Sequence, residues 1–171
     1  MVSKLKKIFK SNKGLSCIET AICTLILLTC IVAFFDVTII GNKFSAMSTN
    51  MTYATRTLSN QGGVRMYPNS DWPVGKDYIN SSYLYSNIKK GFNNAGIKDT
   101  EWNVKINGVT LSPTTMLSVD RNGEIEVEMT IKYKWDTLAS ISPINPTFEK
   151  TIKRYTISTY KIRNGGLTTD F

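Results

Sequence analysis

The residues that could do chemistry in this chain are few, and the most informative of them is Glu19. It lies in an apolar N-terminal stretch, five positions after Gly14, in the sequence KGLSCIE. A carboxylate in a membrane costs roughly 2.5–3.5 kcal/mol at the bilayer centre and less near an interface. An acid in this position therefore predicts a function and a partner that offsets its charge.

The other reactive side chains form no pattern typical of catalysis or metal binding. The chain has no histidine, the commonest metal ligand and general base. Its three cysteines, Cys17, Cys23 and Cys30, all lie in the apolar stretch, at spacings that match no zinc motif. We interpret them as packing residues and exclude a disulfide-stapled exported module. Without a nucleophile beside a base or a glycine-rich phosphate loop, we expect no enzyme, no catalytic residue, no metal site and no cofactor.

A basic leader and a long apolar helix must position Glu19. Residues 1–14 carry five lysines and no acid, and residues 20–35 carry no charge. By the positive-inside rule, the lysines hold the N-terminus in the cytoplasm and the remainder is exported. Residues 20–35 cover about 24 Å as a helix, so spanning a bilayer core of ~30 Å requires extension to Ile40, which includes Asp36. The sequence predicts a single-pass membrane protein with an extracytoplasmic C-terminal domain.

The net charge does not indicate a nucleic-acid partner. The formal charge of +8 comes from 21 basic and 13 acidic residues. Five of the basic residues precede Leu15, and without them 16 basic residues stand against 13 acidic ones. No basic stripe with interleaved aromatic residues remains. We therefore expect no nucleic-acid binding and assign the lysines to membrane topology.

The sequence around Gly14 resembles the processing site of type IV prepilins: a basic leader, glycine, four uncharged residues, glutamate, then an apolar run. In that family a membrane peptidase cuts after the glycine, so the resemblance implies prepilin peptidase as a partner and Leu15 as the new N-terminus. It also implies that Glu19 meets the N-terminal amine of a neighbouring subunit. A secretory signal peptide and an uncleaved anchor are the alternatives. A signal peptide should have an apolar region of about 7–15 residues and an A-x-A-like site, and both alternatives leave Glu19 unexplained.

A helical pattern continues beyond the membrane segment. Apolar residues recur at alternating steps of three and four, which predicts a narrow seam that packs against one neighbour. We expect one helix over residues 15–61, with its membrane part at about 15–40, a bend at Gly41 and a stop at Gly62-Gly63. An independent coiled coil is the alternative use of the same seam. The seam comprises Val37, Ile40, Phe44, Met47, Met51, Ala54 and Leu58.

Residues 62–171 predict an exported α+β domain. A short helix is expected from Asn80 or Ser81 to Gly96, where Leu84, Ile88 and Phe92 recur at helical spacing. Strand patterns then take over.

Two hairpins and two longer strands are expected in this domain. Asn107-Gly108 predicts a two-residue hairpin loop that pairs Ile106 with Val109. A second hairpin is expected around residues 121–123, with Gly123 in the left-handed region and residues 117–119 facing residues 125–127.

Residues 124–135 alternate strictly between apolar and polar, which predicts a strand with one buried and one wet face. The last strand is expected at about residues 151–162, with a bulge where its phase switches. Its cations, Lys150, Lys153 and Arg154, would face the glutamates of residues 124–128.

The predicted fold class is α+β: a long N-terminal helix, first transmembrane and then soluble, packed on a C-terminal antiparallel sheet with one short extra helix. Pilin-like proteins have this order of elements. The chain is most similar to the TadE-like minor pilins (pseudopilins) of tight-adherence systems. The similarity lies in Glu19-Thr20-Ala21, in Asp36 near the outer end of the apolar run, and in a late strand, a loop with Pro143 and Pro146, and a final strand.

The resemblance implies a structural subunit of a type IV or tight-adherence pilus, or of a related secretion apparatus. Its partners would be prepilin peptidase, other pilin-like subunits and membrane lipid, with Glu19 and Asp36 as assembly residues. A pilin-like component of a competence or conjugation apparatus is an alternative. So is an unprocessed single-pass anchor with an extracellular adhesion or binding domain, in which Trp72, Trp102 and Trp135 could form a carbohydrate platform. Core and interface positions are the commoner role for such tryptophans.

Overall fold

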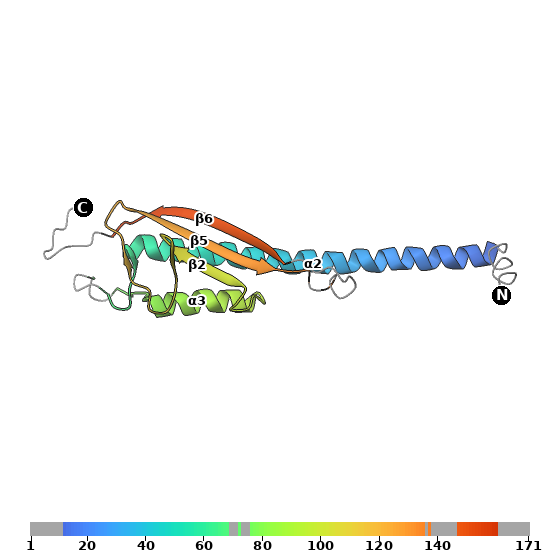
Figure 1. Cartoon of the computed structure of the whole chain (residues 1–171), viewed down its shortest axis with the longest axis horizontal. Coiled ribbons are helices and arrows are strands. Elements are labelled where there is room, and N and C mark those ends of the chain that lie inside the picture. Colours follow the sequence, from blue (N-terminus) through green and yellow to red (C-terminus); the bar gives the residue numbers. More distant parts are fainter. Residues whose placement is uncertain (1–11, 69–71, 73–75, 136, 138–146, 161–171) are drawn as a thin grey trace. The chain divides into compact units, whose positions relative to one another are not determined.

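The computed structural model of this chain describes residues 12–68, 72, 76–135, 137 and 147–160 (Figure 1). It divides into two compact units. The first joins residues 1–40 with residues 134–146, and the second joins residues 41–133 with residues 147–171. Its described elements are two helices and antiparallel strands, so the predicted α+β class is confirmed.

The long helix, α2, runs over Asn12–Gln61 as one element of 50 residues. Gly41 lies inside it without interrupting it. Gly62 follows the helix with φ +66°, a left-handed conformation that favours glycine, so the predicted stop signal is confirmed.

The apolar part of α2 is exposed along most of its length in the first unit. It is the one helix among the described residues that is long and apolar enough to cross a membrane, with a mean hydropathy of 2.5. Its threonine hydroxyls donate to backbone carbonyls four residues earlier, as in Thr20 to Ser16 at 2.8 Å and Thr24 to Thr20 at 2.8 Å. Such bonds satisfy hydroxyls where no water is available. This part of the helix is therefore chemically compatible with a single-pass membrane anchor.

The second helix, α3, spans Ser81–Asn94 in the second unit. Asn80 caps it by accepting a hydrogen bond from the Tyr83 amide at 2.7 Å. The predicted buried face of Leu84, Ile88 and Phe92 is confirmed.

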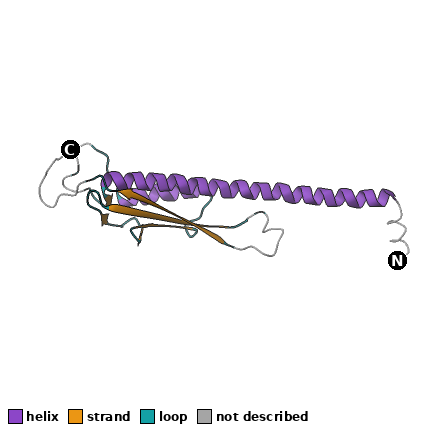
Figure 2. Cartoon of the chain, turned by 90° about the horizontal axis from the view of Figure 1, so that it is seen from above, coloured by secondary structure: helices purple, strands orange, loops and turns teal. Residues whose placement is uncertain are grey.

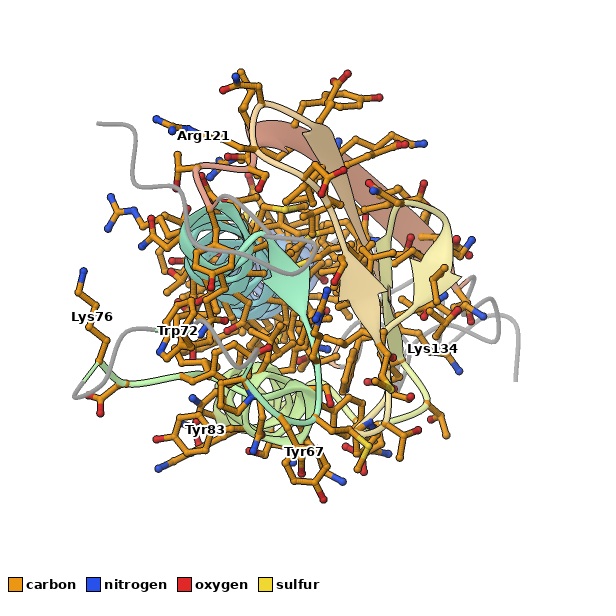
Figure 3. All side chains as sticks on the ribbon, turned by 90° about the vertical axis from the view of Figure 1, so that its left-hand side faces the viewer. Tyr67, Trp72, Lys76, Tyr83, Arg121 and Lys134 are labelled. Carbon is orange, nitrogen blue, oxygen red and sulfur yellow. The ribbon has the colours of Figure 1, made fainter. Side chains whose placement is uncertain are left out.

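A four-stranded antiparallel sheet covers these helices in the second unit, in the order β3-β2-β5-β6. Its strands are β2 (Trp102–Ile106), β3 (Val109–Thr110), β5 (Glu124–Tyr133) and β6 (Phe148–Ile157). Residues 41–61 of α2 and the whole of α3 lie on one face of this sheet (Figures 2 and 3). The first predicted hairpin is confirmed: Ile106 pairs with Val109, and Asn107 and Gly108 both have positive φ.

The second predicted hairpin is wrong. Strand β4 (Leu117–Ser118) pairs with β1 (Gly63–Val64), not with β5. A side chain at Gly63 would collide with the Leu117 carbonyl, so this glycine allows the two strands to approach. The left-handed residue of the following turn is Asn122, with φ 66°, and not Gly123. Gly123 instead donates its amide to the Asp120 carbonyl at 2.9 Å and closes a four-residue turn.

The buried face of β5 is confirmed, since Ile125, Val127, Met129 and Ile131 are fully buried. The strand ends at Tyr133, so the predicted extension to Trp135 is wrong.

Strand β6 pairs with β5 in one unbroken register, from Glu124 with Ile157 to Tyr133 with Phe148. No bulge is present between these residues. The expected phase switch arises because Ile152 packs on the core, whereas Tyr155 and Ile157 pair with glutamates of the wet face and are each 57% exposed. Residues 138–146, with Pro143 and Pro146, and residue 162 lie outside the described residues.

The wet face of the sheet carries one of the three predicted cation contacts. Lys153 contacts Glu126 at 2.7 Å and Glu128 at 2.8 Å. Arg154 instead donates to the Thr52 hydroxyl of α2 at 2.8 Å. Successive residues of a strand point to opposite faces. Lys150 and Arg154 therefore share the face opposite to Lys153. The prediction that these two residues face the glutamates is wrong.

Candidate functional site

Glu19 lies on the exposed surface of the apolar part of α2. No described residue forms a hydrogen bond or an ion pair with its carboxylate. Ile22 and Ile26, three and seven residues later on the same side of the helix, are 54% and 55% exposed. The carboxylate therefore sits at the edge of an apolar surface without a described partner of its own chain.

Another side of the same helical segment is built from small residues. Ser16, Thr20, Ala21 and Thr24 line a shallow depression that Leu25 and Leu28 extend. Small residues at spacings of four let two transmembrane helices approach closely. This part of α2 thus has the side chains that close helix packing requires, next to an exposed acid.

Asp36 has a different environment, although the sequence grouped it with Glu19. It is only 2% exposed, and its Oδ1 accepts a hydrogen bond from the Thr137 amide at 2.9 Å. Both residues belong to the first unit. A buried carboxylate is stable only where such donors replace its lost hydration. The structure therefore gives Asp36 a contact within the chain, where the sequence predicted one between subunits.

The predicted processing site lies within α2. The helix begins at Asn12, so the bond between Gly14 and Leu15 is part of its first turn. Most of the leader, residues 1–11, and the side chains of residues 12–15 lie outside the described part.

The predicted seam divides between the two units. In the first unit Ile40 is buried, but Val37 is 56% exposed, so it does not pack within the described chain. In the second unit Met47, Met51, Ala54 and Leu58 are part of the core, and Phe44 contacts the Tyr133 ring at 5.2 Å between centroids. These five seam residues pack within the second unit itself, so the structure gives them a different role from the alternative, an independent coiled coil.

The cysteines and carboxylates form no described metal site. Cys17, Cys23 and Cys30 are all exposed along α2. Among the described residues, no group of three or more histidine, cysteine, aspartate or glutamate side chains could hold a metal ion.

The three tryptophans have separate surroundings. Trp102 packs on Tyr85 and Phe92, at 5.4 and 5.2 Å between ring centroids, beside the core. Trp72 packs on Tyr78 and Tyr160, both at 5.1 Å. Trp135 belongs to the first unit.

No family model, curated protein or solved structure matches this chain. Its function is therefore inferred from its own residues.

Sequence reasoning missed a cavity beside Trp72, because the residues around it come from three distant segments. They include Asn60 at the end of α2, Asp77 before α3 and Tyr160 after β6. A local pattern cannot signal such a site. The only sign in the sequence is that two aromatic residues and several polar ones lie near predicted element ends.

Proposed function

We propose that this chain is a pilin-like, TadE-like structural subunit of a type IV or tight-adherence pilus, or of a related secretion apparatus. The observation that carries the proposal is Glu19: an exposed carboxylate on an apolar helix of membrane-spanning length, with no described partner in its own chain. Asp36, the second acid of this helix segment, differs from Glu19 in this respect, because the chain itself supplies its hydrogen-bond donor. The first acid needs a donor from elsewhere.

The proposed donor is the N-terminal amine of a neighbouring subunit. Cleavage after Gly14 would create that amine at Leu15, four residues before the subunit's own Glu19. Two opposite charges 4 Å apart gain about 4 kcal/mol at an effective dielectric constant near 20. This is similar to the roughly 2.5–3.5 kcal/mol that a carboxylate costs at mid-membrane. The pair would thus offset the cost of Glu19 in one axial register, and a shifted neighbour would lose that compensation.

The rest of the chain suits a structural role. The small residues of α2 at 16–24 permit helix contacts in the membrane. The helix then continues into the core of the second unit, so that the same element which would assemble also carries the exported domain. We infer that the domain faces the outside of the cell, because the lysine-rich N-terminus stays in the cytoplasm.

Mass spectrometry of the mature N-terminus tests the processing step. A chain that begins at Leu15 is the expected result. An intact Met1 would instead favour the second candidate, an unprocessed single-pass protein whose exported domain binds a ligand. The observation that favours this candidate is the cavity at Trp72. A start near residues 45–48 would indicate signal peptidase and overturn both.

Substitution of Glu19 tests the assembly step. Glu19→Gln keeps the shape of the side chain and removes its charge. We expect normal membrane insertion but a loss of at least tenfold in the assembled fraction, measured by shearing cells and quantifying the chain in the released filaments. Cys23→Ala, one turn later on the same side of α2, is the matched control and should assemble normally. Normal assembly of Glu19→Gln would contradict the proposed register mechanism.

A further inference from the structure

The second unit contains a cavity of about 400 Å³ at the C-terminal end of α2, which we call the Trp72 cavity. Its aromatic wall is formed by Trp72 and Tyr160. Its polar lining comes from Asn60, Gln61, Lys76, Asp77 and Thr159. Small-molecule sites typically range from about 300 to 1,000 Å³, so this cavity fits a small ligand of one or two rings.

One wall of the cavity is held firmly by α2. The Thr159 amide and hydroxyl both donate to the Ser59 carbonyl at 2.9 Å, and the Ser59 hydroxyl donates to the Ile157 carbonyl at 2.6 Å. Gly62 allows the close approach that follows, since a side chain there would lie 3.1 Å from the Tyr160 Cβ. The segment that carries Thr159 and Tyr160 is therefore fixed before any ligand binds.

The opposite wall is fixed through Trp72. Its indole Nε1 donates to the Lys76 carbonyl at 3.0 Å. The ring packs edge-on against Tyr78 and at a tilt of 41° to Tyr160. Figure 3 shows that the Lys76 side chain extends outward from beside Trp72. An aromatic surface held in one orientation loses little entropy when a ligand stacks on it.

The lining selects a class of ligand. Lys76 and Asp77 have opposite charges, and the cavity lies at the C-terminal, partly negative end of a helix, so a phosphate or another anion gains little there. Among the described lining residues Ile79 is the only aliphatic one, which disfavours an acyl chain. A sugar ring fits both features, because its C–H face stacks on an indole while its hydroxyls bond to amides, carboxylates and hydroxyls.

We propose that the Trp72 cavity binds a neutral pyranose sugar, with Trp72 as the stacking platform and Asp77 and Asn60 as acceptors and donors for its hydroxyls. This site would give the exported domain a ligand on a cell or matrix surface. It does not depend on processing or assembly, because all of its residues lie in one unit of a single chain.

The test uses the full chain, labelled with nitrogen-15 and held in a phosphocholine detergent, because detergents with sugar headgroups would compete. Methyl α-glucopyranoside, N-acetylglucosamine and lactose are titrated separately while the three indole N–H signals are followed by NMR. We expect a saturable shift of the Trp72 signal at millimolar concentrations of at least one of the sugars, with the Trp135 signal unchanged. Trp72→Phe assigns the signal. No saturable shift with any of these sugars, or stronger binding of inorganic phosphate, overturns the proposal.

Two variants and one control separate binding from folding. Asp77→Asn removes one charge from an exposed side chain, and we expect about tenfold weaker binding because hydrogen bonds to charged groups are the stronger ones. Asn60→Ala should also weaken binding, again at an exposed position. Trp135→Phe is the matched aromatic control and should bind normally. Unchanged affinity in both cavity variants overturns the proposal.

Discussion

At the scale of single residues, a buried polar side chain of one helix depends on a glycine of the other helix. Asn50 is buried in the second unit, and its amide donates to the Ile88 carbonyl of α3 at 3.1 Å. Gly91, in the last turn of α3, makes this contact possible, because a Cβ there would collide with the Asn50 amide. A glycine that looks like a weak point of the helix is thus a packing requirement.

Gly91→Ala should therefore destabilise the domain, although alanine is the better helix former by ~1 kcal/mol. We expect a net loss of about 1–3 kcal/mol, the usual range for overpacking, measured by urea unfolding followed by near-ultraviolet circular dichroism. Gly41→Ala is the matched control, since Gly41 is also helical and nothing lies within 4 Å of its added Cβ. That variant should be neutral or slightly stabilising. A stabilised Gly91→Ala would refute the packing role.

Asp36→Ala should loosen the backbone around Thr137, because it removes the acceptor of the Thr137 amide. Thr137 is half-buried, so its unsatisfied amide should cost about 1–1.5 kcal/mol, the lower part of the range for a buried group, which corresponds to roughly tenfold faster hydrogen exchange. Exchange measured by NMR at Thr137 checks this expectation. Asp36→Asn keeps an acceptor oxygen and should show a smaller increase. If exchange at Thr137 in both variants is as slow as in the unsubstituted chain, the hydrogen bond does not hold this segment.

At the scale of elements, the wet face of the sheet is organised around one lysine. Lys153 on β6 joins Glu126 and Glu128 on β5, and Lys105 on β2 lies 3.7 Å from Glu128. The hydrogen bond from Lys153 lowers the pKa of the Glu128 carboxyl below its ordinary 4.5, while the partial loss of hydration acts in the opposite direction. The two carboxylates raise the pKa of Lys153.

The lowered pKa of Glu128 fixes the pH range in which this network stabilises the sheet. Its contribution is fully present above pH 4.5 and is lost as the pH falls through the lowered folded-state pKa. We expect Lys153→Met to melt at a slightly lower Tm than the unsubstituted chain near neutral pH, with the difference closing in acid and in high salt. Lys150→Met removes the same charge from the same strand, and its difference in Tm from the unsubstituted chain should not depend on pH in this way. A gap that persists in acid would exclude the network as its cause.

The sequence predicted those elements whose signals are local. The hairpin at Asn107-Gly108 and the helix capped by Asn80 each depend on residues within a few positions, and both are confirmed. The partner of β4 depends on Gly63, more than 50 positions away, and was missed. The burial of Asp36 was missed for the same reason, because its donor is Thr137. The Trp72 cavity had no local signal.

At the scale of the whole molecule, α2 belongs to both compact units. Its residues 41–61 supply Met47, Met51, Ala54 and Leu58 to the core of the second unit, which also contains side chains of α3 and the sheet. The second unit therefore cannot be defined as the part of the chain after the long helix. It begins within that helix.

A chain that begins at Gly41 should fold as a soluble, cooperatively melting domain, because it retains the core of the second unit. A chain that begins at Gly62 should not fold, since it loses four core side chains. Burial of each large one contributes about 1.5–3 kcal/mol, and typical total stabilities are only about 5–15 kcal/mol. Circular dichroism and thermal unfolding of the two fragments check this expectation. A folded fragment without residues 41–61 would show that α2 is dispensable for the core.

The open edge of β6 has a consequence for a protein that would accumulate in many copies at one place. The strand is ten residues long, lies at the end of its sheet, and exposes Tyr155 and Ile157. Such unpaired backbone is a template for cross-β aggregation. Lys150, Lys153 and Arg154 give this rim a surplus of positive charge, which repels the same rim of another molecule. The chain thus protects the long edge strand β6 against amyloid-like stacking with cations, while β3, at the other edge of the same sheet, is only two residues long.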